Sequence, residues 1–254
     1  MRNLTQILAL GLAVAPLTGG PAWAGGGVPA LPKAIGYALY VDGVEVGHSR
    51  MAIRQGADAV VFESQTHVQL GPNVIDLKSR TVADPKTFRV REFSFDGTKG
   101  GMSTATHVVV AGDSATGWVK STAATGRRPA TVHDPAGFVV WEDWVMDLEV
   151  ALALRQRVSG ANRTEYRLVF ANSFLPADMI AGFAGETEIQ ARDRSMVARR
   201  LEIFLFGGNP LYSHVDPETG IPVYIDFPGT RTEAFREDFF GDNPLSRYTA
   251  PADK

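Results

Sequence analysis

The feature that most constrains the fold is a two-residue alternation of apolar and polar side chains in the first half of the chain. Its clearest stretch runs from Val60 to Leu70. Successive side chains of a β-strand point to opposite faces of a sheet, so this alternation predicts a strand with one mainly apolar and one mainly polar face. Such strands are typical of an antiparallel sheet that covers a core on one side and meets water on the other. The first face comprises Val60, Phe62, Ser64, Thr66, Val68 and Leu70, and the second comprises Val61, Glu63, Gln65, His67 and Gln69.

Turn-forming residues divide this half of the chain into consecutive strands. Asp42-Gly43 separates residues 35–41 from residues 44–53, and this pair accepts the positive φ angles of a type I′ hairpin turn. Gly71-Pro72-Asn73 and the glycine-rich segment 96–101 mark later turns. The intervening strands are roughly 8 to 12 residues long, against a usual length of about 5 to 6. We predict a mainly β protein, with a long-stranded antiparallel sheet that is strongly curved or forms a half-open β-barrel.

The period of the apolar residues changes between Val140 and Arg157, where they recur every three or four positions. This spacing predicts one amphipathic helix, and its acidic start and arginine-containing end complement the helix dipole. We expect the helix to pack its apolar stripe against the concave face of the sheet and to leave its acidic residues in solvent. The stripe comprises Trp141, Trp144, Val145, Leu148 and Leu152, and the acidic residues are Glu142, Asp143, Asp147 and Glu149.

The rest of the chain returns mainly to strand patterns. Apolar residues on both faces near Phe206 suggest a strand that is buried on two sides. The predicted elements are strands at 164–170, 186–194, 196–206, 221–227 and 230–236, and a short helix at Pro176–Phe183.

Residues 1–24 have the pattern of a secretory signal peptide. Arg2 supplies a positive start, an apolar stretch follows, and Ala22-Trp23-Ala24 forms a small-x-small cleavage site. The apolar stretch is about half of the roughly 20 residues that a membrane-spanning helix needs. We expect a periplasmic or secreted protein after cleavage near Ala24, without a transmembrane segment in the mature chain. The predicted organisation is a signal peptide (1–24), a flexible leader (25–33), a single β-rich domain (34–240) and a loose C-terminal tail (241–254).

Composition and motifs argue against several kinds of chemistry. The chain has no cysteine, so it has no disulfide, thiolate metal site or thiol nucleophile. Its net charge of −3 becomes −4 when Arg2 is removed with the signal, which provides no basic surface for nucleic acid. Motifs for serine hydrolases, zinc proteases, phosphate loops and dinucleotide binding are absent from the sequence. We therefore predict no cofactor and no metal site. A metal site would need strands to bring histidines together, and His48, His67 and His107 are the candidates.

Two segments carry a resemblance to a known architecture. The first is the opening hairpin Tyr37–Gly47, and the second is the segment Val215–Ile225, which contains Asp-Pro-Glu-Thr-Gly-Ile-Pro. They resemble uncharacterised bacterial periplasmic domains that are related to lipoprotein carriers, the LolA-like half-open β-barrels. Between the two segments, the order of a strand meander, a helix and further strands is also similar. The resemblance implies a half-barrel fold and, in some members, the binding of hydrophobic molecules.

Our leading hypothesis is a binding protein of the bacterial envelope without catalytic activity. A curved sheet with a helix across its mouth can either pack solid or leave a slot for a hydrophobic or lipid-like ligand, which needs roughly 300 Å³ or more. An envelope protein is the other possible partner. The aromatic residues that could line the slot are Phe62, Trp118, Trp141, Trp144, Phe170, Phe204 and Phe206.

Two other functions remain open from the sequence. One is a hydrolase whose acid and base come from separate strands, such as His48 or His67 with Glu63. The other is a structural or assembly protein that recruits a partner strand to an exposed sheet edge.

Overall fold

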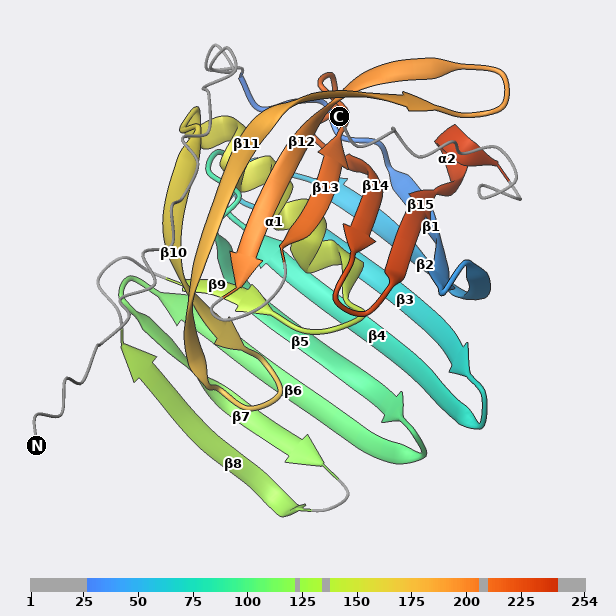
Figure 1. Ribbon diagram of the computed structural model, residues 1–254. Helices are drawn as coiled ribbons and strands as arrows, with labels where there is room; N and C mark the ends of the chain where they lie inside the picture. Colours follow the sequence, from blue (N-terminus) through green and yellow to red (C-terminus); the bar gives the residue numbers. More distant parts are fainter. Residues whose placement is uncertain (1–26, 122–123, 134–137, 206–209, 242–254) are drawn as a thin grey trace, which may run out of the picture.

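One large curved sheet makes up most of the protein (Figure 1). The computed structural model describes residues 27–121, 124–133, 138–205 and 210–241. Within these ranges, 15 strands are hydrogen-bonded in the order β8-β7-β6-β5-β4-β3-β2-β1-β15-β14-β13-β12-β11-β10-β9. All neighbouring strands are antiparallel except β9 and β10, which are parallel. This architecture confirms the predicted mainly β, barrel-like class.

The elements have the following bounds. The first eight strands are β1 (Ala34–Val41), β2 (Val44–Gln55), β3 (Val60–Leu70), β4 (Asn73–Ala83), β5 (Val90–Lys99), β6 (Met102–Ala111), β7 (Ser114–Ser121) and β8 (Ala124–His133). The next elements are β9 (Phe138–Trp141), α1 (Met146–Ser159), β10 (Arg163–Phe170), β11 (Pro176–Gln190) and β12 (Ser195–Leu205). The last are β13 (Leu211–Val215), β14 (Pro222–Phe227), β15 (Thr232–Arg236) and α2 (Glu237–Phe240).

The first six strands form the meander that the alternation predicts, and β7 and β8, which the sequence patterns did not predict, continue it. In β3, every second side chain from Val60 to Val68 is buried, whereas the side chains that alternate with them are partly or fully exposed. The first turn also has the predicted geometry, because Asp42 and Gly43 both have positive φ angles (51° and 77°). One face of the meander therefore covers the core, and the other meets solvent.

The sheet curves back toward itself around α1. Figure 1 shows the helix between the long strands β2–β5 and the later strands β11–β14. On the inner side of the sheet, the hydroxyl of Thr106 in β6 donates a hydrogen bond of 2.7 Å to the carbonyl oxygen of Ala171, which follows β10. Strands from the two halves of the chain thus enclose one core, in which Phe62, Phe93 and Leu154 are fully buried.

The helix packs against the concave face as predicted, but it begins later and is buried more completely. Residues 138–141 form β9, so Trp141 lies in a strand and Trp144 lies in the connection before α1. Eleven of the fourteen helical residues are buried, including Asp147 and Glu149. The expectation of a solvated acidic face is wrong because a helix enclosed by a barrel-like sheet is covered on nearly all sides.

The short helix predicted at Pro176–Phe183 is also wrong. These residues open β11 and pair with β10 on one side and with β12 on the other. Hydrogen bonding to two neighbouring strands satisfies the backbone of this segment and overrides its weak local preference for helix.

A second, smaller apolar cluster lies on the opposite face of β1, β14 and β15. Phe239 and Phe240 of α2 pack there against Phe235 of β15, which also contacts the rings of Tyr40 and Tyr224. The short helix α2 thus covers a patch of the outer surface of the sheet.

Several predictions concern the ends of the chain. The predicted signal peptide, residues 25–26 of the leader and residues 242–254 of the tail lie outside the described residues. In the described part of the leader, the carbonyl oxygen of Lys33 accepts a hydrogen bond of 2.8 Å from the backbone of Ile53 in β2. Among the described ranges, no helix has both the length and the apolar character required to span a membrane.

Candidate functional site

The space between α1 and the sheet is largely filled by side chains. Beneath the middle of the helix, around Phe88, Leu148 and Leu152, a void of about 10 Å³ remains. A larger pocket of about 160 Å³ lies at the N-terminal end of α1. It is lined by Leu39, Trp141, Glu142, Asp143, Trp144, Val145, Met146, Glu149, Phe227, Thr230, Thr232 and Ala234, and we call it the helix-entry pocket.

Segments that are distant in the sequence assemble this pocket. Its floor includes Leu39 of β1, Glu149 of α1 and Ala234 of β15, all of which are buried. Its rim includes Asp143 and Thr230, which are exposed. The pocket therefore connects the buried first turn of the helix with the surface between the β9–α1 connection and the β14–β15 turn.

Trp144 reaches the pocket from an unusual backbone conformation. Its φ angle is +68°, in the left-handed region that bulky residues rarely adopt. Such a conformation destabilises a non-glycine residue by about 1 to 2 kcal/mol. Phe88 and Phe174, outside the pocket, also have positive φ angles, so the strain at Trp144 supports the rim as a candidate only together with the buried carboxylates.

Glu149 is the most unusual polar residue of the pocket. It is 3% exposed, and neither of its carboxylate oxygens has a hydrogen-bond partner. Burial, with a further contribution from the negative charge of Asp143, raises the pKa of Glu149 to about 8. This carboxyl group is therefore mostly protonated at neutral pH when the pocket holds no positive charge.

Glu142 is a second buried carboxylate, but it is partly satisfied. Its Oε1 atom accepts a hydrogen bond from the ammonium of Lys99 at the end of β5 and another from the amide of Asn172, at 3.3 Å. Its Oε2 atom is buried and has no partner. Burial raises the pKa of Glu142, whereas the charge of Lys99 opposes this shift.

Asp147 lies in the first turn of α1, as Glu149 does, and both of its carboxylate oxygens accept hydrogen bonds. Its Oδ1 atom accepts hydrogen bonds from Ser64 (3.2 Å) and Ser79 (2.9 Å), and its Oδ2 atom accepts one from Thr81 (2.7 Å). These hydroxyls lie on the concave face of β3 and β4. Asp147 thus anchors the start of α1 to the sheet, and its role is structural.

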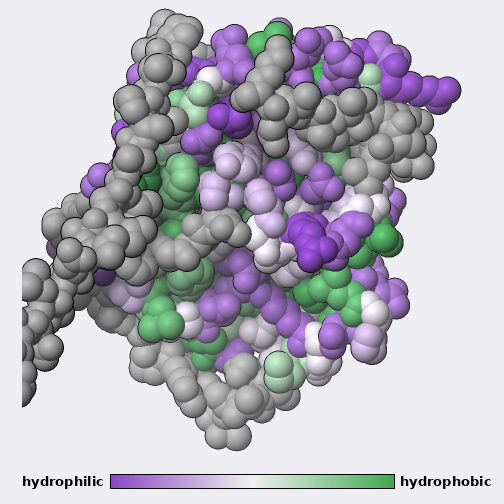
Figure 2. Space-filling model, in the orientation of Figure 1, coloured by the Kyte–Doolittle hydropathy of each residue, from purple (hydrophilic) through white to green (hydrophobic). Residues whose placement is uncertain are grey.

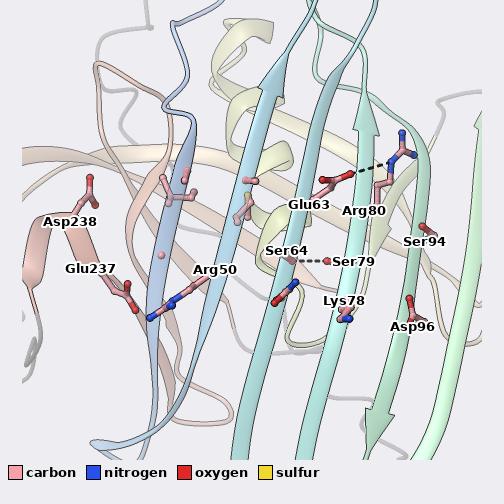
Figure 3. Close-up of a pocket in the computed structure, with 16 residues that line it drawn as sticks. Arg50, Glu63, Ser64, Lys78, Ser79, Arg80, Ser94, Asp96, Glu237 and Asp238 are labelled. Atoms are coloured by element: carbon pink, nitrogen blue, oxygen red, sulfur yellow. Dashed lines mark hydrogen bonds and ion pairs between the residues drawn. The ribbon is translucent and has the colours of Figure 1, made fainter.

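A larger groove of about 860 Å³ lies on the outer face of the sheet, beside α2 (Figure 3). The carboxylates of Glu237 and Asp238 stand on one side of it, and side chains of both charges project from β2 to β5. Glu63 pairs there with Arg80, and both side chains are about 40% exposed. Figure 2 shows polar and apolar residues interspersed over another face of the molecule, with the apolar ones in separate groups. The outer groove has mixed charge and solvated side chains, so the helix-entry pocket is the more specific site.

The structure brings only part of the predicted aromatic set to one place. Trp141 and Trp144 line the helix-entry pocket. Phe62 is fully buried in the main core, and Phe170 is partly buried against it. The latter two contribute to the filled interior and do not line the pocket.

The remaining aromatic candidates lie elsewhere. Trp118 is opposite His107 in the register of β6 and β7, on the face that points away from Thr106 and the core. Phe204 is 38% exposed, because β12 alternates near its end and buries Ile203 instead. The expected two-sided burial of this strand is therefore wrong at Phe204. Phe206 lies outside the described residues.

The histidine and glutamate pair of the hydrolase hypothesis is not assembled. His48 and His67 are neighbours on β2 and β3, with ring centroids 6.0 Å apart, and His67 hydrogen-bonds Asp76 at 2.5 Å. Glu63 lies four residues before His67 in β3, or about 13 Å away, and pairs with Arg54. The described ranges also contain no group of three or more residues suited to hold a metal ion.

Fold and site together define a barrel-like antiparallel β protein with an internal helix and a small acidic, aromatic pocket. No protein-family model matches the sequence, and no curated protein matches it. The chain is similar to a beta-barrel-like protein of a domain of unknown function, DUF1849, from Brucella abortus, with 11% identity and a TM-score of 0.48, over 82% of this chain and 97% of that one. It is also similar to a DUF1089 family protein from Pseudomonas aeruginosa, with 17% identity and a TM-score of 0.41, over 72% and 90% of the two chains.

Sequence patterns predicted the tryptophans of the pocket but not its carboxylates. Glu142 and Glu149 are surrounded in the sequence by other charged residues, which normally indicates a solvated surface. One available signal was the run of apolar residues from Val150 to Leu154, which leaves little polar surface for the middle of the helix.

Proposed function

We propose that this chain is an exported binding protein of the bacterial envelope, which holds an amphipathic small molecule or part of a lipid without catalysis. The observation that supports this proposal is the helix-entry pocket, where aromatic and aliphatic side chains meet two incompletely satisfied carboxylates. Small-molecule sites typically combine an apolar lining with a few polar groups in this way. The resemblance to LolA-like half-barrels, which implies binding of hydrophobic molecules in some members, also favours a ligand in this pocket.

The volume of the pocket limits the part of a ligand that it can hold. At about 160 Å³, it is roughly half of the 300 Å³ at which drug-sized ligand sites begin. A complete diacyl lipid therefore does not fit. We infer that the pocket takes a head group or one end of an amphiphile, and that the rest of the ligand lies across the exposed rim.

Export is the second part of the proposal, and it rests on the pattern of residues 1–24. Expression of the full chain in a Gram-negative host, followed by periplasmic extraction and N-terminal sequencing, tests it. We expect a mature N-terminus near Gly25. An unprocessed chain that stays in the cytosolic fraction would contradict this part.

Native mass spectrometry of the protein purified under mild conditions tests ligand binding. We expect a bound small molecule or lipid that denaturing extraction releases. In the matched experiment, Ala234→Leu fills part of the pocket and should reduce the occupied fraction at least fivefold. Ala191→Leu, in the β11–β12 turn, adds the same atoms elsewhere and should leave the occupancy unchanged. An empty wild-type protein in all preparations, or equal occupancy in both variants, would refute the proposal.

The assembly hypothesis receives less support. Strand β8 ends the sheet order and has only β7 as a strand neighbour among the described residues. Its sequence contains Arg127, Arg128 and Pro129. Proline cannot donate a backbone hydrogen bond, and charged residues and proline are features by which natural edge strands avoid pairing with other chains.

A further inference from the structure

Three buried carboxylate oxygens of the helix-entry pocket lack hydrogen-bond partners. They are Oε2 of Glu142 and both oxygens of Glu149. Among the described residues, no other carboxylate has a buried oxygen without a partner. A buried acceptor without a donor is unfavourable by about 1 to 3 kcal/mol. The lining of the pocket therefore donates no hydrogen bond to these three oxygens, and a ligand that supplies donors to them gains affinity.

The charge of the lining indicates the kind of donor. Three acidic residues, Glu142, Asp143 and Glu149, line the pocket, and none of its lining residues is basic. Lys99 approaches from β5 and pairs with Oε1 of Glu142. Tyr37 of β1 is also near Glu149, but its hydroxyl donates to the carbonyl oxygen of Pro222, at 2.8 Å. Lys99 therefore pairs with Glu142 alone, and no residue that lines the pocket offers a positive charge or a hydrogen bond to the carboxyl group of Glu149.

The apolar part of the lining suits the carbon atoms next to a cationic group. Trp141, Trp144 and Phe227 provide aromatic surface, and tryptophan is the aromatic side chain that attracts cations most strongly. Leu39 and Met146 add aliphatic surface. Water alone could satisfy the carboxylates, but it would gain nothing from the aromatic surface.

We propose that the helix-entry pocket binds the primary ammonium group of an amphiphilic amine, with Glu149 and Glu142 as acceptors and the adjoining carbon atoms against Trp141 and Trp144. A primary ammonium has three N–H donors, as many as the unpartnered carboxylate oxygens. A quaternary ammonium has none, so the pocket should distinguish the two. This inference rests on the proposed binding function and names the chemical class of the ligand.

The chemistry predicts a particular pH dependence. Because the pKa of Glu149 is raised to about 8 in the empty pocket, a cation must promote loss of its proton on binding. Affinity for a primary ammonium should therefore rise between pH 6 and pH 8, while the amine itself stays charged up to about pH 10. The negative charge of Asp143 disfavours the charged form of Glu149, whereas the positive charge of Lys99 favours the charged form of the neighbouring Glu142.

Isothermal titration calorimetry with n-butylammonium, 1-butanol and pentanoate tests the proposal on the full protein. We expect n-butylammonium to bind at least tenfold more tightly than the neutral alcohol at pH 8, and pentanoate not to bind. Glu149→Gln should remove both the preference and its pH dependence. Glu165→Gln, at an exposed position of β10 outside the pocket, is the matched control and should change neither.

Two sources of the amine can be separated with the same protein. Short-chain phosphatidylethanolamine carries a primary ammonium on a lipid, and short-chain phosphatidylcholine is its quaternary counterpart. If the affinity for phosphatidylethanolamine exceeds the affinities for n-butylammonium and for phosphatidylcholine, the ligand is a lipid head group. A preference for n-butylammonium over both lipids identifies a free amine.

Other outcomes overturn the inference. Equal affinity for n-butylammonium and 1-butanol refutes recognition of the ammonium but leaves the proposed binding function intact. An ammonium preference that persists in Glu149→Gln refutes the assigned site. Binding of none of these probes also overturns the inference, and native mass spectrometry then decides the proposed function independently.

Discussion

Glu149→Gln should change the pH dependence of stability in a way that isolates one buried carboxyl group. Burial raises the pKa of Glu149 from 4.5 to about 8, so the folded protein holds a proton that the unfolded chain releases. The contribution of Glu149 to the free energy of unfolding is fully present below about pH 4.5 and declines as the pH rises toward 8. The decline amounts to about 1 kcal/mol at pH 5 and about 3 kcal/mol at pH 7, since each pKa unit corresponds to about 1.4 kcal/mol.

Glutamine has the same shape and does not ionise, so the variant should not show this decline. Urea unfolding of both proteins at pH 5, 6, 7 and 8, without added amine, measures the difference in free energy of unfolding. We expect the variant to gain roughly 3 kcal/mol relative to the wild type between pH 5 and pH 8. Glu165→Gln is the control and should follow the wild type. If the free energies of unfolding of Glu149→Gln and the wild type change in parallel with pH, the carboxyl group is solvated or paired and the reasoning is refuted.

Three further predictions concern other groups. Burial and the charge of Arg200 lower the pKa of His214 from 6.5 to about 4, so its stabilising contribution declines as the pH falls below 6.5. His214→Phe should prevent this decline, with a relative gain of about 2 kcal/mol at pH 5 by urea unfolding. Asp147→Ala should reduce the free energy of unfolding by about 3 kcal/mol, because Thr81 loses its buried acceptor, and Asp147→Asn should lose less. Trp144→Gly should relieve the positive φ angle and change the thermal midpoint little, but weaken n-butylammonium binding at least tenfold in calorimetry. A large fall in the midpoint with unchanged binding would contradict the proposed role of Trp144.

Local patterns predicted the first half of the fold well because each strand carries its own alternation and each turn its own chemistry. The pairing register between neighbouring strands was harder to predict. Val41 pairs with Val44 as the hairpin turn requires, which on simple counting places Tyr37 opposite His48. The structure pairs Tyr37 with Ser49 because the register shifts by one residue between Leu39 and Tyr40. An irregularity of this kind depends on the neighbouring strands, and a single strand sequence does not reveal it.

The second half shows where tertiary context overrides local pattern. The predicted helical pattern begins at Val140, yet Val139 and Val140 of β9 pair with Leu168 and Val169 in a parallel arrangement. The acidic start of α1 is typical of a helix in solvent, but the closing sheet covers it. Burial of Glu149 could not be inferred from its neighbours in the sequence, because β1 and β15, which line the same pocket, lie more than 80 residues away along the chain.

The contrast between Asp147 and Glu149 bears most directly on function. Both carboxyl groups are buried in the first turn of one helix, but hydroxyls of β3 and β4 satisfy Asp147, whereas Glu149 has no donor. The sheet therefore supplies hydrogen-bond donors to a buried carboxylate where that carboxylate anchors α1, as it does at Asp147. The unsatisfied oxygens of Glu142 and Glu149 and the left-handed backbone of Trp144 instead fall within eight consecutive residues around one pocket. Local features that oppose folding tend to concentrate at functional sites, so a donor from outside the chain accounts for this concentration better than a role in stability.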